Sequence, residues 1–73
     1  MGESAIYHLT ILDWTANKSA FIFIVRTYTN LRTMDILDRA RAGNMTFFAG
    51  TRSDLRDISE NLGKAGIPYK IHG

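Results

Sequence analysis

The chain has 73 residues, which is enough for one small domain but too few for a multidomain enzyme or a membrane transporter. It contains no Cys, which excludes a disulfide framework, a Cys-ligated zinc site and a Cys nucleophile. Nine Lys and Arg residues against seven Asp and Glu residues give a net charge of +2, and the basic residues are dispersed rather than clustered as in a typical nucleic-acid module.

The N-terminal residues show no signal-peptide pattern, and no apolar run reaches the roughly 20 residues of a membrane span. We therefore expect a cytoplasmic location and no membrane association. We expect residues 1–5 to form a flexible N-terminal tail and residues 6–73 to form a single domain.

The first predicted element is a strand over residues 6–12, in which Tyr7, Leu9 and Ile11 alternate onto one face. Trp14 follows in a predicted turn. It is expected to pack beside an aromatic neighbour such as Tyr7 or Tyr69, or to serve as an exposed anchor for a partner.

The next segment, residues 20–28, is ambiguous. Its sequence AFIFIVRTY is rich in β-branched and aromatic residues, which favours a strand that would form a hairpin with residues 6–14. Phe21, Ile24 and Val25 also recur at helical spacing, which favours a helix. The local pattern leaves both interpretations open.

The second half is easier to interpret. Residues 51–64 form a predicted helix with an apolar stripe, and Thr51 and Asp54 have the spacing of a capping box at its start. Gly66 is expected to end this helix in a left-handed conformation. The remaining predicted elements are a helix over residues 33–42 and short strands over residues 45–49 and 69–72.

Ala16, Asn17 and Lys18 precede the ambiguous apolar segment, and further matching residues follow along the chain. These are Ala20, Val25, Arg26, Thr29, Leu31, Gly50, Leu62, Ala65 and Gly66. On these residues the chain from Tyr7 to His72 resembles the C-terminal domain of the bacterial ribosomal stalk protein of the large subunit. The resemblance implies an α+β fold of order β-α-α-β-α-β, with a three-stranded antiparallel sheet and three helices on one face. The alternative is β-β-α-β-α-β, with residues 20–28 as a strand.

In the stalk family a basic helical surface recruits translation GTPases. Lys18 and Arg26 match basic positions of that surface, whereas Phe23 stands where the family usually carries Lys. The resemblance therefore implies a non-enzymatic adaptor or recruitment domain, related to translation, with a less basic and more apolar contact surface. Its partner would be a translation GTPase or another cytosolic protein, and self-association into a homo-oligomer is a second expectation.

The expected protein-binding residues are Lys18, Ile22, Phe23, Arg26 and Arg32, from the first helix and the start of the second. Two of them, Ile22 and Phe23, would be apolar anchors. The three basic side chains would steer an acidic partner to the surface.

Two alternative functions rest on other residues. Asp13-Trp14-Thr15 and Gly66-Ile67-Pro68 resemble pieces of the ClpS-type adaptors, which share this fold. That resemblance implies an N-degron adaptor in which Asp13 would lie near the bound amine. The arginines of the first two helices instead suggest a small nucleic-acid-binding domain, whose affinity would fall steeply with salt.

The residues show no catalytic pattern. No Ser lies in a recognisable nucleophile turn, so we expect no enzymatic activity and no cofactor. The only histidines, His8 and His72, fall on predicted strands that could be neighbours. Without Cys, two imidazoles make a poor metal site unless a carboxylate such as Asp13 joins them, and we expect no metal ligands.

Overall fold

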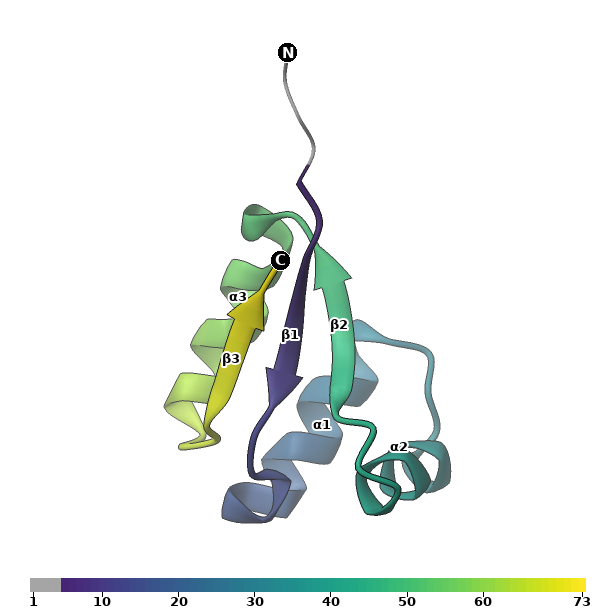
Figure 1. Ribbon diagram of the computed structural model, residues 1–73. Helices are drawn as coiled ribbons and strands as arrows, with labels where there is room; N and C mark the ends of the chain where they lie inside the picture. The colour runs from purple at the N-terminus through teal and green to yellow at the C-terminus, as the bar shows by residue number, and fades with distance from the viewer. Residues whose placement is uncertain (1–4) are drawn as a thin grey trace.

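Three strands form one antiparallel sheet of order β2-β1-β3, and the helices α1 and α3 lie behind it in Figure 1. The computed structural model describes residues 5–73. In chain order its elements are β1 (Tyr7–Ile11), the 3-10 helix η1 (Trp14–Asn17), α1 (Lys18–Tyr28), α2 (Thr33–Arg41), β2 (Thr46–Gly50), α3 (Arg52–Lys64) and β3 (Tyr69–His72).

This order confirms the predicted β-α-α-β-α-β fold, and the element bounds differ from the predicted ones by at most two residues. The strand prediction for residues 6–12 was also correct about its faces, because Leu9 and Ile11 are buried toward the helices. The predicted tail, residues 1–5, lies outside the described residues except for Ala5. Within residues 5–73, no helix is long and apolar enough to cross a membrane.

Helix α1 contains the segment whose composition favours a strand. At its start the Asn17 side-chain oxygen accepts a hydrogen bond from the Ala20 backbone N–H at 3.2 Å, which caps the helix. Phe21, Ile24 and Val25 form one stripe that is at least 95 % buried, since their exposed fractions are 0 %, 5 % and 0 %. Burial of this stripe outweighs the weak local propensity for a strand.

The alternative fold with residues 20–28 as a strand is therefore wrong. The central strand β1 already pairs with β2 along one edge and with β3 along the other. Helix α2 adds Ile36 and Ala40 to the same core, with exposed fractions of 0 % and 7 %.

A β-bulge lets two consecutive phenylalanines of β2 enter the core. Leu9 pairs with Phe48. The register then shifts by one residue, so that Thr10 pairs with Thr46 and Phe47 is skipped. Both phenylalanines are buried despite the alternation expected of a regular strand. The Phe47 ring meets the Phe21 ring edge-on, with centroids 5.6 Å apart, and so joins the sheet to α1.

Helix α3 begins with the predicted capping box. The Asp54 N–H donates to the Thr51 hydroxyl at 3.2 Å, and the Thr51 N–H donates to the Asp54 carboxylate at 3.0 Å. Gly50 lies against this box, because a Cβ at position 50 would stand 2.8 Å from Asp54 Oδ2. At the other end, Gly66 has a φ of +75°, the left-handed conformation that the sequence predicts.

Candidate protein-binding surface

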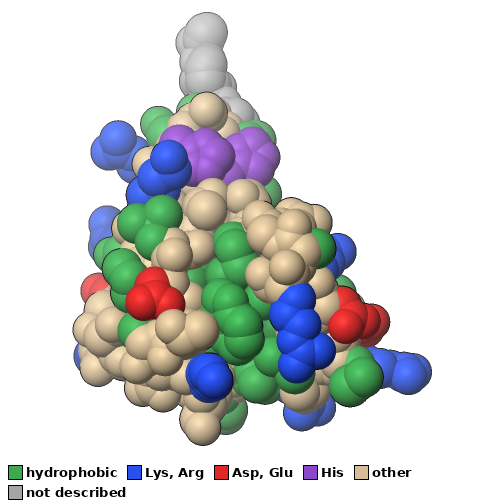
Figure 2. Space-filling model, turned by 60° about the horizontal axis from the view of Figure 1, so that its bottom comes forward, with side chains coloured by type: hydrophobic (Ala, Val, Ile, Leu, Met, Phe, Trp, Pro, Cys, Tyr) green, Lys and Arg blue, Asp and Glu red, His purple; other side chains and the backbone are tan. Residues whose placement is uncertain are grey.

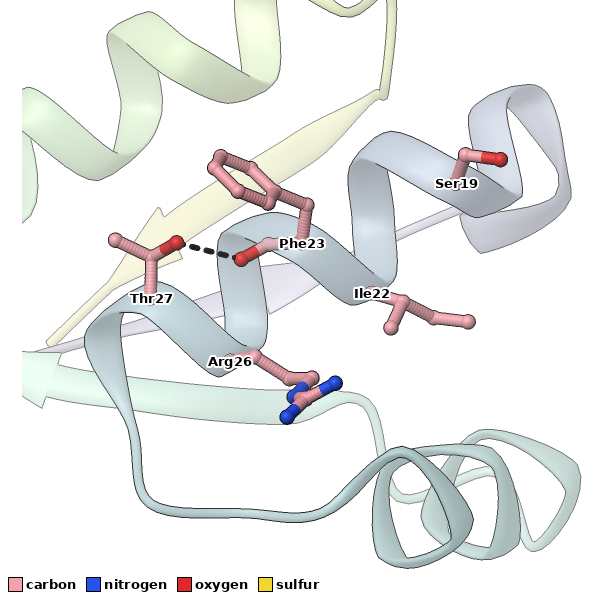
Figure 3. A pocket seen from close by; sticks show the side chains of 5 residues that line it. All are labelled: Ser19, Ile22, Phe23, Arg26 and Thr27. Atoms are coloured by element: carbon pink, nitrogen blue, oxygen red, sulfur yellow. Dashed lines mark hydrogen bonds between the residues drawn. The ribbon is translucent and has the colours of Figure 1, made fainter.

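The outer surface of α1 carries five side chains at positions i, i+3, i+4, i+7 and i+8 along the helix. Together they line a shallow hollow of about 450 Å³, and they are Ser19, Ile22, Phe23, Arg26 and Thr27 (Figure 3). Since residues at these spacings share one side of an α-helix, the hollow follows α1 on the side opposite the buried stripe. We call these five residues the α1 outer surface.

Phe23 is the most unusual member of the α1 outer surface. Its side chain is 69 % exposed, the largest exposed fraction among the large hydrophobic residues that the structure describes. Ile22, by contrast, is half-buried and packs against the core. In Figure 3, Phe23 and Thr27 point to the side where α3 lies, and Ile22 and Arg26 point to the side of α2.

The helix keeps its shape beneath these side chains through hydrogen bonds in its last turns. The Thr27 hydroxyl donates to the Phe23 backbone carbonyl at 2.7 Å (Figure 3), and the Thr29 hydroxyl donates to the Val25 carbonyl at 2.6 Å. These bonds engage two carbonyls near the C-terminal end of α1. The exposed Phe23 ring therefore stands on a well-formed helix.

The charges on α1 and on the turn that follows it have one sign. Between Asp13 and Asp35 the sequence contains three basic residues, Lys18, Arg26 and Arg32, and no acidic residue. The Arg26 guanidinium donates to the Thr33 hydroxyl at 3.4 Å, so it reaches from α1 toward the start of α2. The surface thus combines an exposed aromatic ring with cationic groups, a composition suited to binding another protein.

Three of the five predicted binding residues come together in the hollow: Ile22, Phe23 and Arg26. The other two do not line it. The Lys18 ammonium, at the N-terminal end of α1, lies 5.8 Å from the centre of the Trp14 ring, a cation–π distance. Arg32 is the exposed N-cap residue of α2, beyond the opposite end of α1. These two cations therefore flank the hollow at the ends of the helix.

The sequence prediction missed Thr27 as a lining residue and gave Ser19 no binding role. The helical spacing contains the missing signal, because Ser19 and Thr27 lie four residues before and after Phe23. Once residues 20–28 are treated as a helix, both positions follow from the position of Phe23.

Trp14 and Asp13 have structural contacts beside this surface. The Trp14 ring is half-buried and lies 5.6 Å from the Phe21 ring, so it packs on an aromatic neighbour other than Tyr7 or Tyr69. The Asp13 carboxylate accepts a hydrogen bond from the Thr15 N–H at 3.0 Å and caps η1. An amine ligand at Asp13 would compete with this cap.

Comparisons with known proteins give no relative: no protein-family model matches the chain, and no curated protein matches it significantly. The candidate surface therefore rests on its own geometry. Among residues 5–73 no group of three or more His, Cys, Asp or Glu side chains is placed to hold a metal ion.

Proposed function

We propose that this chain is a non-enzymatic interaction domain of the ribosomal-stalk C-terminal type, which binds an acidic segment of a partner protein on the α1 outer surface. The observation that carries the proposal is the 69 % exposure of Phe23 in a hollow along α1, a helix whose only charged residues, Lys18 and Arg26, are basic. Phe23 lines this hollow together with the half-buried Ile22, and gathered apolar surface of this kind marks protein interaction sites.

The exposed part of Phe23 is large enough to act as a binding anchor. Aromatic side chains bury roughly 150–250 Å², so covering the exposed 69 % of Phe23 would remove roughly 100–170 Å² from water. At about 25 cal/mol per Å² this burial contributes about 3–4 kcal/mol, before the entropy lost on association is subtracted. A contribution of this size is typical of an interface hot spot.

The basic residues have a different role in the proposal. Arg26 lines the hollow, Lys18 and Arg32 flank it, and all three are exposed, so their main effect is on the rate of encounter with an acidic partner. Translation GTPases are the first candidates, because the resemblance to the stalk family points to them. Phe23 stands at a position where that family carries Lys, so an acidic partner with an apolar side chain at its centre fits this surface best.

The proposal is tested by calorimetric titration with two kinds of probe. One is a purified translation GTPase, and the other is a synthetic peptide with Asp and Glu around a single Leu. The Phe23→Ala variant should weaken binding by tenfold or more, equivalent to about 1.4 kcal/mol. The matched control is Met34→Ala, because Met34 is equally exposed at 68 % but lies outside the hollow. It should change the affinity less than twofold.

Charge variants separate steering from anchoring. Arg26→Gln should slow association and reduce its salt dependence, whereas Arg41→Gln, at the end of α2, should have little effect. An equal decrease of the association rate in the two variants would indicate a general charge effect and contradict a specific surface. Oligonucleotide binding that is insensitive to Phe23→Ala would favour the nucleic-acid alternative. A homodimer that Phe23→Ala dissociates would instead make a second copy the occupant of this surface.

A further inference from the structure

The face of the sheet that points away from the helices carries both histidines. Leu9 and Ile11 of β1 are buried on the helix side, so the alternating residues His8 and Thr10 face the other way. On the neighbouring strand β3, His72 lies directly opposite His8 in the antiparallel register. Two residues 64 positions apart in the chain are thereby brought side by side, and Figure 2 shows the two imidazoles together at the surface.

The spacing of the two rings suits one small metal ion. Their centroids are 5.8 Å apart and their planes differ by 23°. A metal ion about 2.0–2.1 Å from one nitrogen of each imidazole would hold the ring centroids roughly 5–6 Å apart. His72 is exposed and His8 is half-buried, so binding would require side-chain rotation that directs a nitrogen of each ring at the same ion while the strands stay in place.

A hydrogen-bonded chain orients one of the rings. The Thr10 hydroxyl oxygen lies 2.9 Å from His72 Nε2 and 2.7 Å from the hydroxyl oxygen of Thr46. If His72 Nε2–H donates to Thr10, and Thr10 donates to Thr46, the lone pair of His72 Nδ1 is left for a metal ion. Metal-binding histidines are commonly held in this way, with the second ring nitrogen donating to an oxygen.

The sequence alone predicts no metal ligands, but the strand register brings the two imidazoles together, and we propose that His8 and His72 bind one Cu²⁺ or Zn²⁺ ion, with Thr10 as the positioning residue and water completing the coordination. Imidazole nitrogens suit these two metals, and Cu²⁺ is the tighter of the two in the usual order of affinities. The three strands contain no Asp or Glu, so this face lacks the oxygen ligands that Ca²⁺ or Mg²⁺ requires. Lys70 lies on the same face two residues before His72, and its positive charge weakens the site.

The bound ion would connect β1 with the edge strand β3. A ligand that binds only the folded chain stabilises it in proportion to the logarithm of its concentration over its Kd. The site therefore gives the domain a metal-dependent stability, located at the strand nearest the C-terminal residue of the sequence. It is independent of the α1 outer surface, which lies on the helix side of the sheet.

The test is a titration of the untagged 73-residue chain with ZnCl₂, monitored by calorimetry and by ¹H–¹⁵N NMR spectra. We expect one ion per chain, with the largest shifts at His8, His72 and their strand neighbours. His8→Ala and His72→Ala should each weaken binding at least tenfold, while Lys70→Gln should bind as tightly as the unaltered chain or more tightly. Far-UV circular dichroism of the metal-free variants verifies that they are folded, and the Gln variant at the same position, His8→Gln or His72→Gln, replaces an alanine variant that is not.

Thr10→Val tests the positioning role, because valine has the shape of threonine without the hydroxyl. We expect it to weaken Zn²⁺ binding by about tenfold while the fold and the stoichiometry stay the same. An unchanged affinity would overturn the role of Thr10. Zn²⁺ binding that survives in the double variant His8→Ala/His72→Ala, or the absence of binding to the unaltered chain, would overturn the site itself.

Discussion

Phe21 and Phe23 lie two residues apart, and truncating each of them gives the sharpest test of how this chain uses its apolar segment. In an α-helix residues two apart point in nearly opposite directions, whereas in a strand they share one face. Phe21 is fully buried and Phe23 is 69 % exposed. The two alanine variants therefore remove the same side chain from opposite environments on one element.

The structure gives each variant an expected magnitude. Removing a fully buried Phe costs about 3–5 kcal/mol, which is a large share of the roughly 4–11 kcal/mol of unfolding free energy typical of this chain length. For Phe23, the buried 31 % of the side chain corresponds to roughly 50–80 Å², which contributes about 1–2 kcal/mol at about 25 cal/mol per Å², and the higher helix propensity of Ala offsets about 0.5 kcal/mol of that. We expect Phe23→Ala to lower the free energy of unfolding by only about 1 kcal/mol, well below the loss in Phe21→Ala.

The assay is urea unfolding followed by far-UV circular dichroism. Circular dichroism is preferable to Trp14 fluorescence, because Trp14 packs on Phe21 and its signal would change in that variant even without unfolding. A similar destabilisation in both variants would refute the helix, since it would place the two rings on one buried face. A loss above about 2 kcal/mol in Phe23→Ala alone would mean that Phe23 is part of the core in solution, and the proposed binding surface would lose its anchor.

Three further predictions concern the ends of the helices. Asn17→Ala should destabilise the domain by about 1–3 kcal/mol in thermal unfolding, because the Asn17 side chain caps α1 and also donates to the Ala65 carbonyl at 3.2 Å. Asn17→Asp keeps the cap and loses only the donor to Ala65, so it should destabilise the domain less than Asn17→Ala does. Equal destabilisation by the two variants would contradict a capping role. Gly50→Ala should destabilise by about 1 kcal/mol or more, because the new Cβ would push the Asp54 carboxylate out of its capping box. Gly63→Ala is the matched control within α3, where a Cβ meets open space, and it should stabilise the domain by about 0.5–1 kcal/mol.

The fold was predictable from the sequence as far as the signals were local. The capping box of Thr51 and Asp54, the stripe of α3 and the left-handed Gly66 all act within a few residues, and all are present as predicted. The conformation of residues 20–28 was different. Its β-branched and aromatic residues satisfy both a strand and a helix, and the resemblance to the stalk family, rather than the local pattern, favoured the helix.

Other features depended on contacts between distant residues. The bulge that buries both Phe47 and Phe48 follows from how β2 pairs with β1, and a single strand gives no sign of it. The packing of Trp14 on Phe21 and the opposition of His8 and His72 likewise require the three-dimensional register. The candidate surface was partly predictable, because Phe23 falls outside the apolar stripe of α1 as soon as the segment is treated as a helix.

The central claim is that the α1 outer surface is where a partner protein binds. Its most direct test is an NMR titration of the ¹⁵N-labelled chain with an acidic partner that binds it, mapped residue by residue. We predict that the largest amide shifts fall in α1, at residues 19–27, and at the start of α2, while α3 and the histidine face of the sheet stay nearly unchanged. Shifts concentrated in α3 or on the open face of the sheet, with residues 19–27 unaffected, would contradict the account.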